Sequence, residues 1–178
     1  MAVQIGATTH SFSDPTALLS DCHRRIEMFF ETLEKVADHI DEPLAHDAGR
    51  ALESALRYFR EAAPKHTADE EESVFPRLRQ SCDPEVKAAL AAFDVLEQEH
   101  RRAESLHTQI EILGKLCLEQ GHLSNFEAID FRKAVADLGS IYRKHIRMED
   151  VVVFPIAARI LSAADKAEIA GEMAARRG

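Results

Sequence analysis

The sequence predicts an all-α protein, folded as an antiparallel up-down-up-down four-helix bundle with a short C-terminal helix. Of its 178 residues 46% are hydrophobic, with Gly 7 and Pro 6, a composition typical of a compact helical domain. Four long segments repeat apolar residues at steps of three and four, the period of an amphipathic helix. Short connections separate these segments, so neighbouring helices are expected to run antiparallel.

The first two helices are predicted from their apolar stripes and from the residues that begin or break them. Asp14 followed by Pro15 favours a helix start, and the pattern breaks at 41–43. A second helix is expected from about Asp47, with a kink or restart at Pro64. The inward positions are Leu19, His23, Ile26, Phe30, Leu33, Ala37 and Ile40, then Leu52, Leu56, Phe59, Ala63, His66, Glu70 and Ser73.

The third and fourth helices show similar signals. Asp83 and Pro84 open the third helix, and Gly121 is expected to end it. Ser124 and Glu127 form a predicted capping box for the fourth. The inward positions are Phe93, Leu96, His100, Ala103, His107, Ile110, Gly114 and Cys117, then Phe131, Val135, Leu138, Tyr142, His145, Glu149 and Val152.

The predicted domain organisation has three parts. Residues 1–13 form an irregular lead-in, 14–161 form the bundle, and 162–178 form an amphipathic C-terminal helix. Ile169 and Met173 lie on the apolar side of this last helix, so we expect it to pack against the rest of the protein.

Charge and cysteine content narrow the classes of partner and the compartment. The net charge is −9, from 22 basic and 31 acidic residues, which argues against nucleic acid or an anionic membrane as a partner. Cys22, Cys82 and Cys117 are far apart, so neither a disulfide framework nor a thiolate zinc site is expected. Without a signal peptide or a membrane-spanning stretch, the chain is expected to be cytoplasmic.

A repeated pattern gives the strongest functional signal. His66 is followed four residues later by Glu70, and His145 is followed in the same way by Glu149. Each pair precedes a Phe-Pro dipeptide, Phe75-Pro76 or Phe154-Pro155, at the same spacing. Upstream of each copy stands His-Arg-Arg-x-Glu, which begins at His23 and at His100. We interpret this as a duplicated helix pair.

Histidines and glutamates on buried stripes predict a metal centre, because such groups are costly to bury unless they are paired or bind a cation. Four imidazoles with two carboxylates suit iron or manganese, and a carboxylate can bridge two ions. We therefore predict two iron ions with an oxo or hydroxo bridge, with manganese or zinc as alternative occupants. The predicted ligands are His23, His66, Glu70, His100, His145 and Glu149.

Other polar residues near these stripes are weaker candidates. Glu104 is a candidate for an additional ligand or for a hydrogen bond to a ligand, while Tyr142 could hydrogen-bond a molecule bound over the metals. Glu27 lies at a stripe edge, where charges are usually solvated. Asp150, five residues after His145, is out of phase unless the helix bulges. His107 is expected to be a core or pocket residue.

These residues resemble the hemerythrin-like HHE cation-binding family over about residues 14–160. Their order is similar to that in the di-iron domain of bacterial iron–sulfur cluster repair proteins, which implies two irons held by the six predicted ligands. Oxygen-carrying hemerythrins have a histidine where this chain has Glu104, and an aspartate five residues after the fourth-helix histidine as carboxylate ligand. Here Glu149 follows His145 by four residues.

The resemblance implies a bacterial di-iron protein that binds O2, NO or peroxide, or that senses or handles iron, in oxidative or nitrosative stress. No catalytic residue is assigned, and whether the protein is an enzyme stays open. The alternatives are a di-iron oxidoreductase, an iron donor for iron–sulfur cluster repair, and a metal-free helical interaction module. Metal ions and a small diatomic or peroxide ligand are the expected partners, and no protein partner is predicted.

Overall fold

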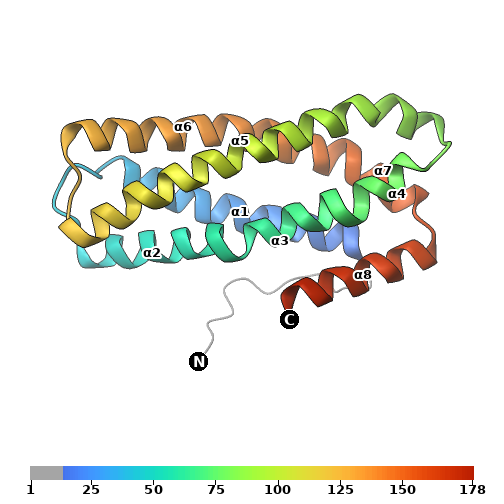
Figure 1. Ribbon diagram of the computed structural model, residues 1–178, viewed down its shortest axis with the longest axis horizontal. Helices are drawn as coiled ribbons and strands as arrows, with labels where there is room; N and C mark the ends of the chain where they lie inside the picture. The colour runs from blue at the N-terminus through green and yellow to red at the C-terminus, as the bar shows by residue number, and fades with distance from the viewer. Residues whose placement is uncertain (1–13) are drawn as a thin grey trace. The chain divides into compact units, whose positions relative to one another are not determined.

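The computed structural model describes residues 14–178, and every regular element in that range is helical (Figure 1). The predicted all-α class is therefore confirmed for the described residues, whereas the predicted lead-in 1–13 lies outside them. The α-helices are α1 Pro15–Ala37, α2 His46–Glu61, α3 Ala63–Ala68, α4 Phe75–Arg79, α5 Pro84–Gln120, α6 Asn125–Met148, α7 Phe154–Ile160 and α8 Ala163–Arg177. Two π-helical stretches, η1 Asp69–Val74 and η2 Glu149–Val153, interrupt them.

Three predicted helix boundaries are confirmed, at the start of α1, the start of α6 and the end of α5, because residues there satisfy or suit the backbone. Helix α1 ends at Ala37, earlier than the break predicted at 41–43. The Asp14 carboxylate accepts a hydrogen bond from the Ala17 amide at 3.1 Å, at the start of α1. Ser124 and Glu127 form the predicted capping box of α6. Gly121 has a φ of 80°, the left-handed conformation that glycine adopts without strain, and it follows the end of α5.

The break predicted near Pro64 is also confirmed. Helix α2 ends at Glu61 and α3 begins at Ala63, which places Pro64 in the first turn of the new helix. Proline is tolerated there because the first helical amides have no acceptor within the helix. The restart leaves Ala63 and His66 buried, as the apolar pattern predicted.

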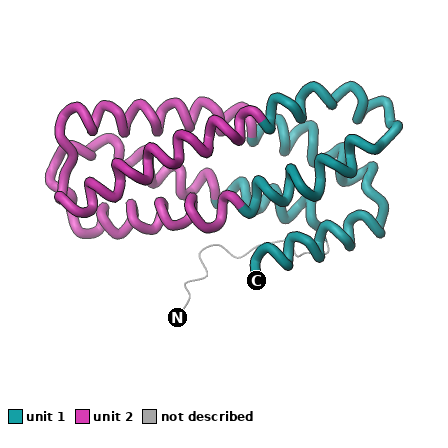
Figure 2. The backbone as a smooth tube through the Cα atoms, in the orientation of Figure 1, with its two compact units in different colours: residues 1–25, 65–97, 146–178 teal, residues 26–64, 98–145 magenta. Residues whose placement is uncertain are grey.

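The described chain forms two compact units (Figure 2). The second unit consists of Ile26–Pro64 and Gln98–His145. Its two helix connections are hydrogen-bonded to each other, because the Leu44 amide donates to Gly121 at 2.6 Å and the Leu123 amide donates to Ile40 at 3.2 Å. Its core includes the fully buried residues Leu33, Leu52, Phe131 and Leu138.

The described residues of the first unit are 14–25, Lys65–Glu97 and Ile146–Gly178. Phe75 and Phe93 stack in its core with ring centroids 5.2 Å apart. Ile169 and Met173 of α8 are 0% exposed, so the predicted packing of the C-terminal helix is confirmed. A capping box formed by Ser162 and Asp165 begins that helix.

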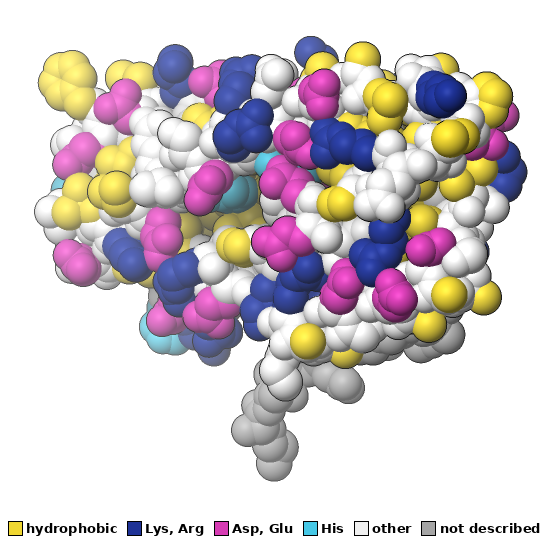
Figure 3. Space-filling view, turned by 45° about the vertical axis from the view of Figure 1, so that its right-hand side comes forward, with side chains coloured by type: hydrophobic (Ala, Val, Ile, Leu, Met, Phe, Trp, Pro, Cys, Tyr) yellow, Lys and Arg dark blue, Asp and Glu magenta, His cyan; other side chains and the backbone are white. Residues whose placement is uncertain are grey.

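The hydropathy of the helices and the charge of the surface bear on possible partners. Within the described part of the chain, no helix combines the length and apolar character needed to cross a membrane. On the face shown in Figure 3, lysine and arginine side chains alternate with aspartate and glutamate. That face therefore presents no large area of one charge.

Candidate metal centre

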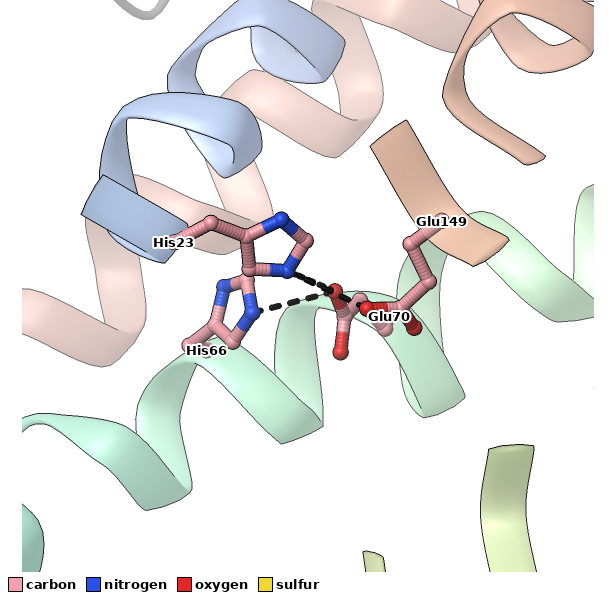
Figure 4. A group of neighbouring side chains, drawn as sticks. All are labelled: His23, His66, Glu70 and Glu149. Carbon is pink, nitrogen blue, oxygen red and sulfur yellow. Dashed lines mark ion pairs between the residues drawn. The ribbon is translucent and has the colours of Figure 1, made fainter. Parts of the chain in front are cut away.

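Four buried side chains from four helical elements meet in the first unit (Figure 4). They are His23 of α1, His66 of α3, Glu70 of η1 and Glu149 of η2. Each offers one ligand atom, and these atoms all lie within 4.8 Å of one another. Both glutamates are 0% exposed, and His23 and His66 are 1% and 5% exposed. The structure thus brings together four of the six residues predicted as ligands.

The imidazole nitrogens of this group face the carboxylates. His23 Nε2 lies 3.1 Å from Glu149 Oε2 and 3.8 Å from Glu70 Oε1. His66 Nε2 lies 3.1 Å from the same Glu70 oxygen. The two histidine rings are 4.8 Å apart and nearly perpendicular, at 80°. Both Nε2 atoms are therefore directed toward one small, oxygen-lined space.

Each glutamate lies in a π-helical stretch that precedes a proline. The Phe75 amide donates to the Glu70 carbonyl and the Phe154 amide to the Glu149 carbonyl, five residues back in each case. Pro76 and Pro155 follow directly, in the first turns of α4 and α7. Because a proline lacks an amide hydrogen and crowds the carbonyl four residues earlier, a wider turn before it relieves the helix.

This wider turn corrects one expectation about burial. A π-helical turn contains an extra residue, so positions after it move forward in phase. Val152 was predicted to point inward but is only half-buried, whereas Val153 is 0% exposed. The prediction was wrong by one residue because it assumed an unbroken α-helical period.

The same bulge brings Asp150 to the back of the His23 ring. His23 Nδ1 lies 3.0 Å from Asp150 Oδ1, and the Ser20 hydroxyl donates to the same oxygen at 2.7 Å. When Nδ1 carries the hydrogen and donates it to Asp150, the lone pair of Nε2 becomes available to a metal ion between this ring and the glutamates. Asp150 was expected to reach the site only if the helix bulged, and it does.

The electrostatics of His23 reflect the surplus of carboxylates. Burial by itself would lower the pKa of His23. The hydrogen bonds to Asp150 and Glu149, with the charges of Glu149 and Glu70, outweigh burial and raise that pKa to about 10. The cluster therefore favours a positive charge at its centre.

The Phe154 ring covers one face of the His23 imidazole. Its ring stacks on the imidazole with centroids 5.2 Å apart and an interplanar angle of 17°. The Phe-Pro dipeptide of the second copy thus places an aromatic ring against the site. The corresponding Phe75 instead stacks on Phe93 in the core.

The other two predicted ligands, His100 and His145, lie together in the second unit, with ring centroids 4.5 Å apart. His145 is 5% exposed, and His100 is half-buried. His145 Nδ1 lies 3.0 Å from Glu99 Oε2, the same carboxylate-to-imidazole arrangement that holds His23. Sequence reasoning missed Glu99. Its only signal is its position directly before His100.

Tyr142 and His107 form a separate polar pair in the second unit. The Tyr142 hydroxyl lies 2.5 Å from His107 Nε2, and His107 stacks on Phe59 at 4.5 Å. Burial raises the pKa of Tyr142 far above its usual range, and burial lowers the pKa of His107 to about 4. Near neutral pH the phenol therefore donates to a neutral imidazole.

The side chains of Glu104 and Glu27 are exposed.

The donor set in the first unit fits a transition-metal ion. Imidazole nitrogen together with carboxylate oxygen is the ligand combination of iron, manganese and zinc in helical proteins. Two fully buried carboxylates are costly in a metal-free interior, and a cation at the centre of the group offsets that cost. No thiolate is needed.

Replacing Asp150 with asparagine should weaken metal binding about 10-fold, because an amide is a poorer acceptor for the His23 Nδ1–H. The measurement is the dissociation constant for ferrous ion, obtained by anaerobic competition with a chelator. Ser20→Ala is the matched control, since it removes only the second hydrogen bond to Asp150 and should have a smaller effect. Equal affinities for wild type and Asp150→Asn would contradict this role.

The buried imidazole and carboxylate groups form a site in this helical protein that could hold a metal ion. A model of the hemerythrin HHE cation binding domain matches residues 14–166. The match spans most of the chain, so this protein belongs to the hemerythrin HHE family, as its residue pattern predicted. Membership in this family indicates binding of metal ions, typically iron.

A curated protein of Haemophilus influenzae, described as uncharacterized, is 28% identical over 172 residues, which cover 94% of this chain and 92% of that protein. No solved structure matches the sequence.

Proposed function

We propose that this protein holds two iron ions in an up-and-down four-helix bundle and uses them to bind a small oxidant or nitrogen oxide. His23 and His66 are the proposed nitrogen ligands of one ion, and His100 and His145 those of the other. Glu70 and Glu149 would supply the carboxylate ligands. The observation that carries the proposal is the pair of fully buried glutamates with histidine Nε2 atoms 3.1 Å away.

Protein side chains prepare each proposed iron position. Asp150 holds His23 by its Nδ1 atom, and Glu99 holds His145 in the same way, so each Nε2 atom is kept in a ligating orientation. Phe154 covers one face of the His23 ring and limits access of water. Iron in such a site supplies redox chemistry and an exchangeable coordination position.

Small ligands fit this arrangement better than large ones. Glu70, Glu149, His23 and His66 are buried, which favours O2, NO or peroxide over a bulky substrate. We therefore propose a role in sensing or handling these molecules, or iron itself, during oxidative or nitrosative stress. An oxidoreductase and an iron donor for cluster repair use the same ligands, and they differ in the reaction that the bound molecule then undergoes.

Metal stoichiometry and gas binding test the proposal. Elemental analysis of protein purified without added metal, or reconstituted anaerobically with ferrous ion, should give two irons per chain. Rapid mixing of the ferrous protein with O2 and with NO should then change its optical spectrum. An iron content near zero after reconstitution would refute the metal centre, and an unchanged spectrum with both gases would refute gas binding.

The same preparation separates the alternative roles. A binder reacts with about one equivalent of ligand, whereas an oxidoreductase consumes peroxide or NO over many turnovers. An iron donor loses iron to an apo-acceptor when it is oxidised or nitrosylated. His66→Ala and His145→Ala provide the comparison with a metal-free interaction module, because only a metal protein should lose metal-dependent stability in these variants.

A further inference from the structure

A further buried carboxylate lies beside the candidate centre without being one of its predicted ligands. Asp69 directly precedes Glu70 in η1, and both are 0% exposed. The Asp69 carboxylate accepts a hydrogen bond from Arg176 Nη1 at 2.9 Å and another from Arg177. Both arginines lie at the C-terminal end of α8.

The contact between Arg176 and η1 extends beyond Asp69. Arg176 also donates to the Ser73 hydroxyl at 3.0 Å and to the Glu72 carboxylate at 3.0 Å. One guanidinium thus joins residues near both ends of the π-helical stretch. Ile169 and Met173 anchor α8 in the core of the same unit, which holds the two arginines over this stretch.

This arrangement addresses a mechanical weakness of the site. A π-helical turn is rarer and less stable than an α-helical one, so the direction of its side chains depends on external contacts. A fully buried aspartate also requires charged partners, and two guanidinium groups supply them. Fixing Asp69 fixes the backbone of its neighbour Glu70, whose Oε1 atom lies 3.1 Å from His66 Nε2.

We propose that Arg176 and Arg177 are positioning residues that hold Glu70 through Asp69, so that these two contacts from α8 set the affinity of the centre for metal. This inference rests on the proposed function, because it concerns the same site. Coupling between two sites is reciprocal, so metal binding also strengthens the docking of α8. The C-terminal helix therefore responds to the metal content of the protein.

The decisive comparison uses two double variants with opposite expectations. Arg176→Gln with Arg177→Gln removes the contacts to Asp69 and should lower the affinity for ferrous ion 10- to 100-fold. Lys166→Gln with Glu168→Gln weakens two exposed contacts of α8, to the Ala158 carbonyl and to Arg77, and should leave the affinity within about twofold. Arg176→Lys with Arg177→Lys should restore part of the loss, since it keeps the charge without the planar fork.

Hydrogen exchange provides a second readout on the unaltered chain. Addition of ferrous ion to wild-type protein should slow amide exchange in α8, whereas a helix that only packs would exchange at the same rate with and without metal. Equal iron affinities in all of the double variants, or unchanged exchange in α8, would overturn the inference. Failure of the wild type to bind ferrous ion would instead refute the proposed function, and with it the basis of this inference.

Discussion

Replacing Glu149 with glutamine is expected to remove the proposed dinuclear centre, so that bound iron falls from the proposed two per chain to at most one. Glu149 is fully buried and its Oε2 atom lies 3.1 Å from His23 Nε2. Glutamine keeps the size of the side chain but cannot supply a negatively charged oxygen to two ions. The wild-type protein should gain about 2.7 kcal/mol of stability when free metal exceeds its dissociation constant about 100-fold, and the variant should lose most of this gain.

Glu27→Gln is the matched control for this prediction. This variant makes the same acid-to-amide change on α1, close in sequence to His23. The side chain of Glu27, however, is exposed. It should retain both irons and the full metal-dependent rise in unfolding temperature. Elemental analysis and thermal unfolding with and without metal measure both effects, and two irons per chain in Glu149→Gln would show that this carboxylate does not bind metal.

His107 should make the metal-free protein less stable in acid. Above pH 6.5 the imidazole is neutral in both the folded and the unfolded chain. Burial lowers its pKa in the folded protein from 6.5 to about 4, so between these values only the unfolded chain takes up the proton. The contribution of the neutral His107 imidazole to stability is therefore fully present above pH 6.5 and is lost as the pH falls through 4. The expected loss is up to about 3 kcal/mol.

The His107→Phe variant isolates this contribution, because the other titrating groups are common to both proteins. Denaturant unfolding at several pH values measures the free energy of unfolding of both proteins. As the pH falls, that of the wild type should decrease relative to that of the variant. Tyr142→Phe removes the hydrogen bond to His107 but keeps the imidazole, and it should preserve the wild-type trend because burial is the cause. A difference that does not change with pH would contradict the burial of a neutral imidazole.

Periodicity and end signals were sufficient to predict the long helices of the described chain, but not the π-helical stretches η1 and η2. Helix starts at Pro15 and Pro84 and the stop at Gly121 depend on neighbouring residues, which a sequence displays directly. The inward positions of His23 and Glu149 also follow from spacing, because a buried stripe repeats every three to four residues.

The contacts that orient the site could not be predicted in the same way. Asp150 reaches His23 only because a π-helical stretch shifts its phase, and spacing alone does not reveal where an extra residue enters a turn. Arg176 and Asp69 are separated by 107 positions, so their pairing depends on how α8 packs. A charged residue such as Glu99 looks from its sequence like any solvent-facing acid.

The contacts of His23 also bear on the ancestry of the fold. His23 belongs to the first copy of the repeat, yet Glu149, Asp150 and Phe154, which surround it, all belong to the second. An ancestor with a single helix pair would have lacked these groups unless two chains associated as a symmetric dimer. The two copies also differ where they contact the site, because Asp150 of the second copy stands at the position of Glu71 in the first.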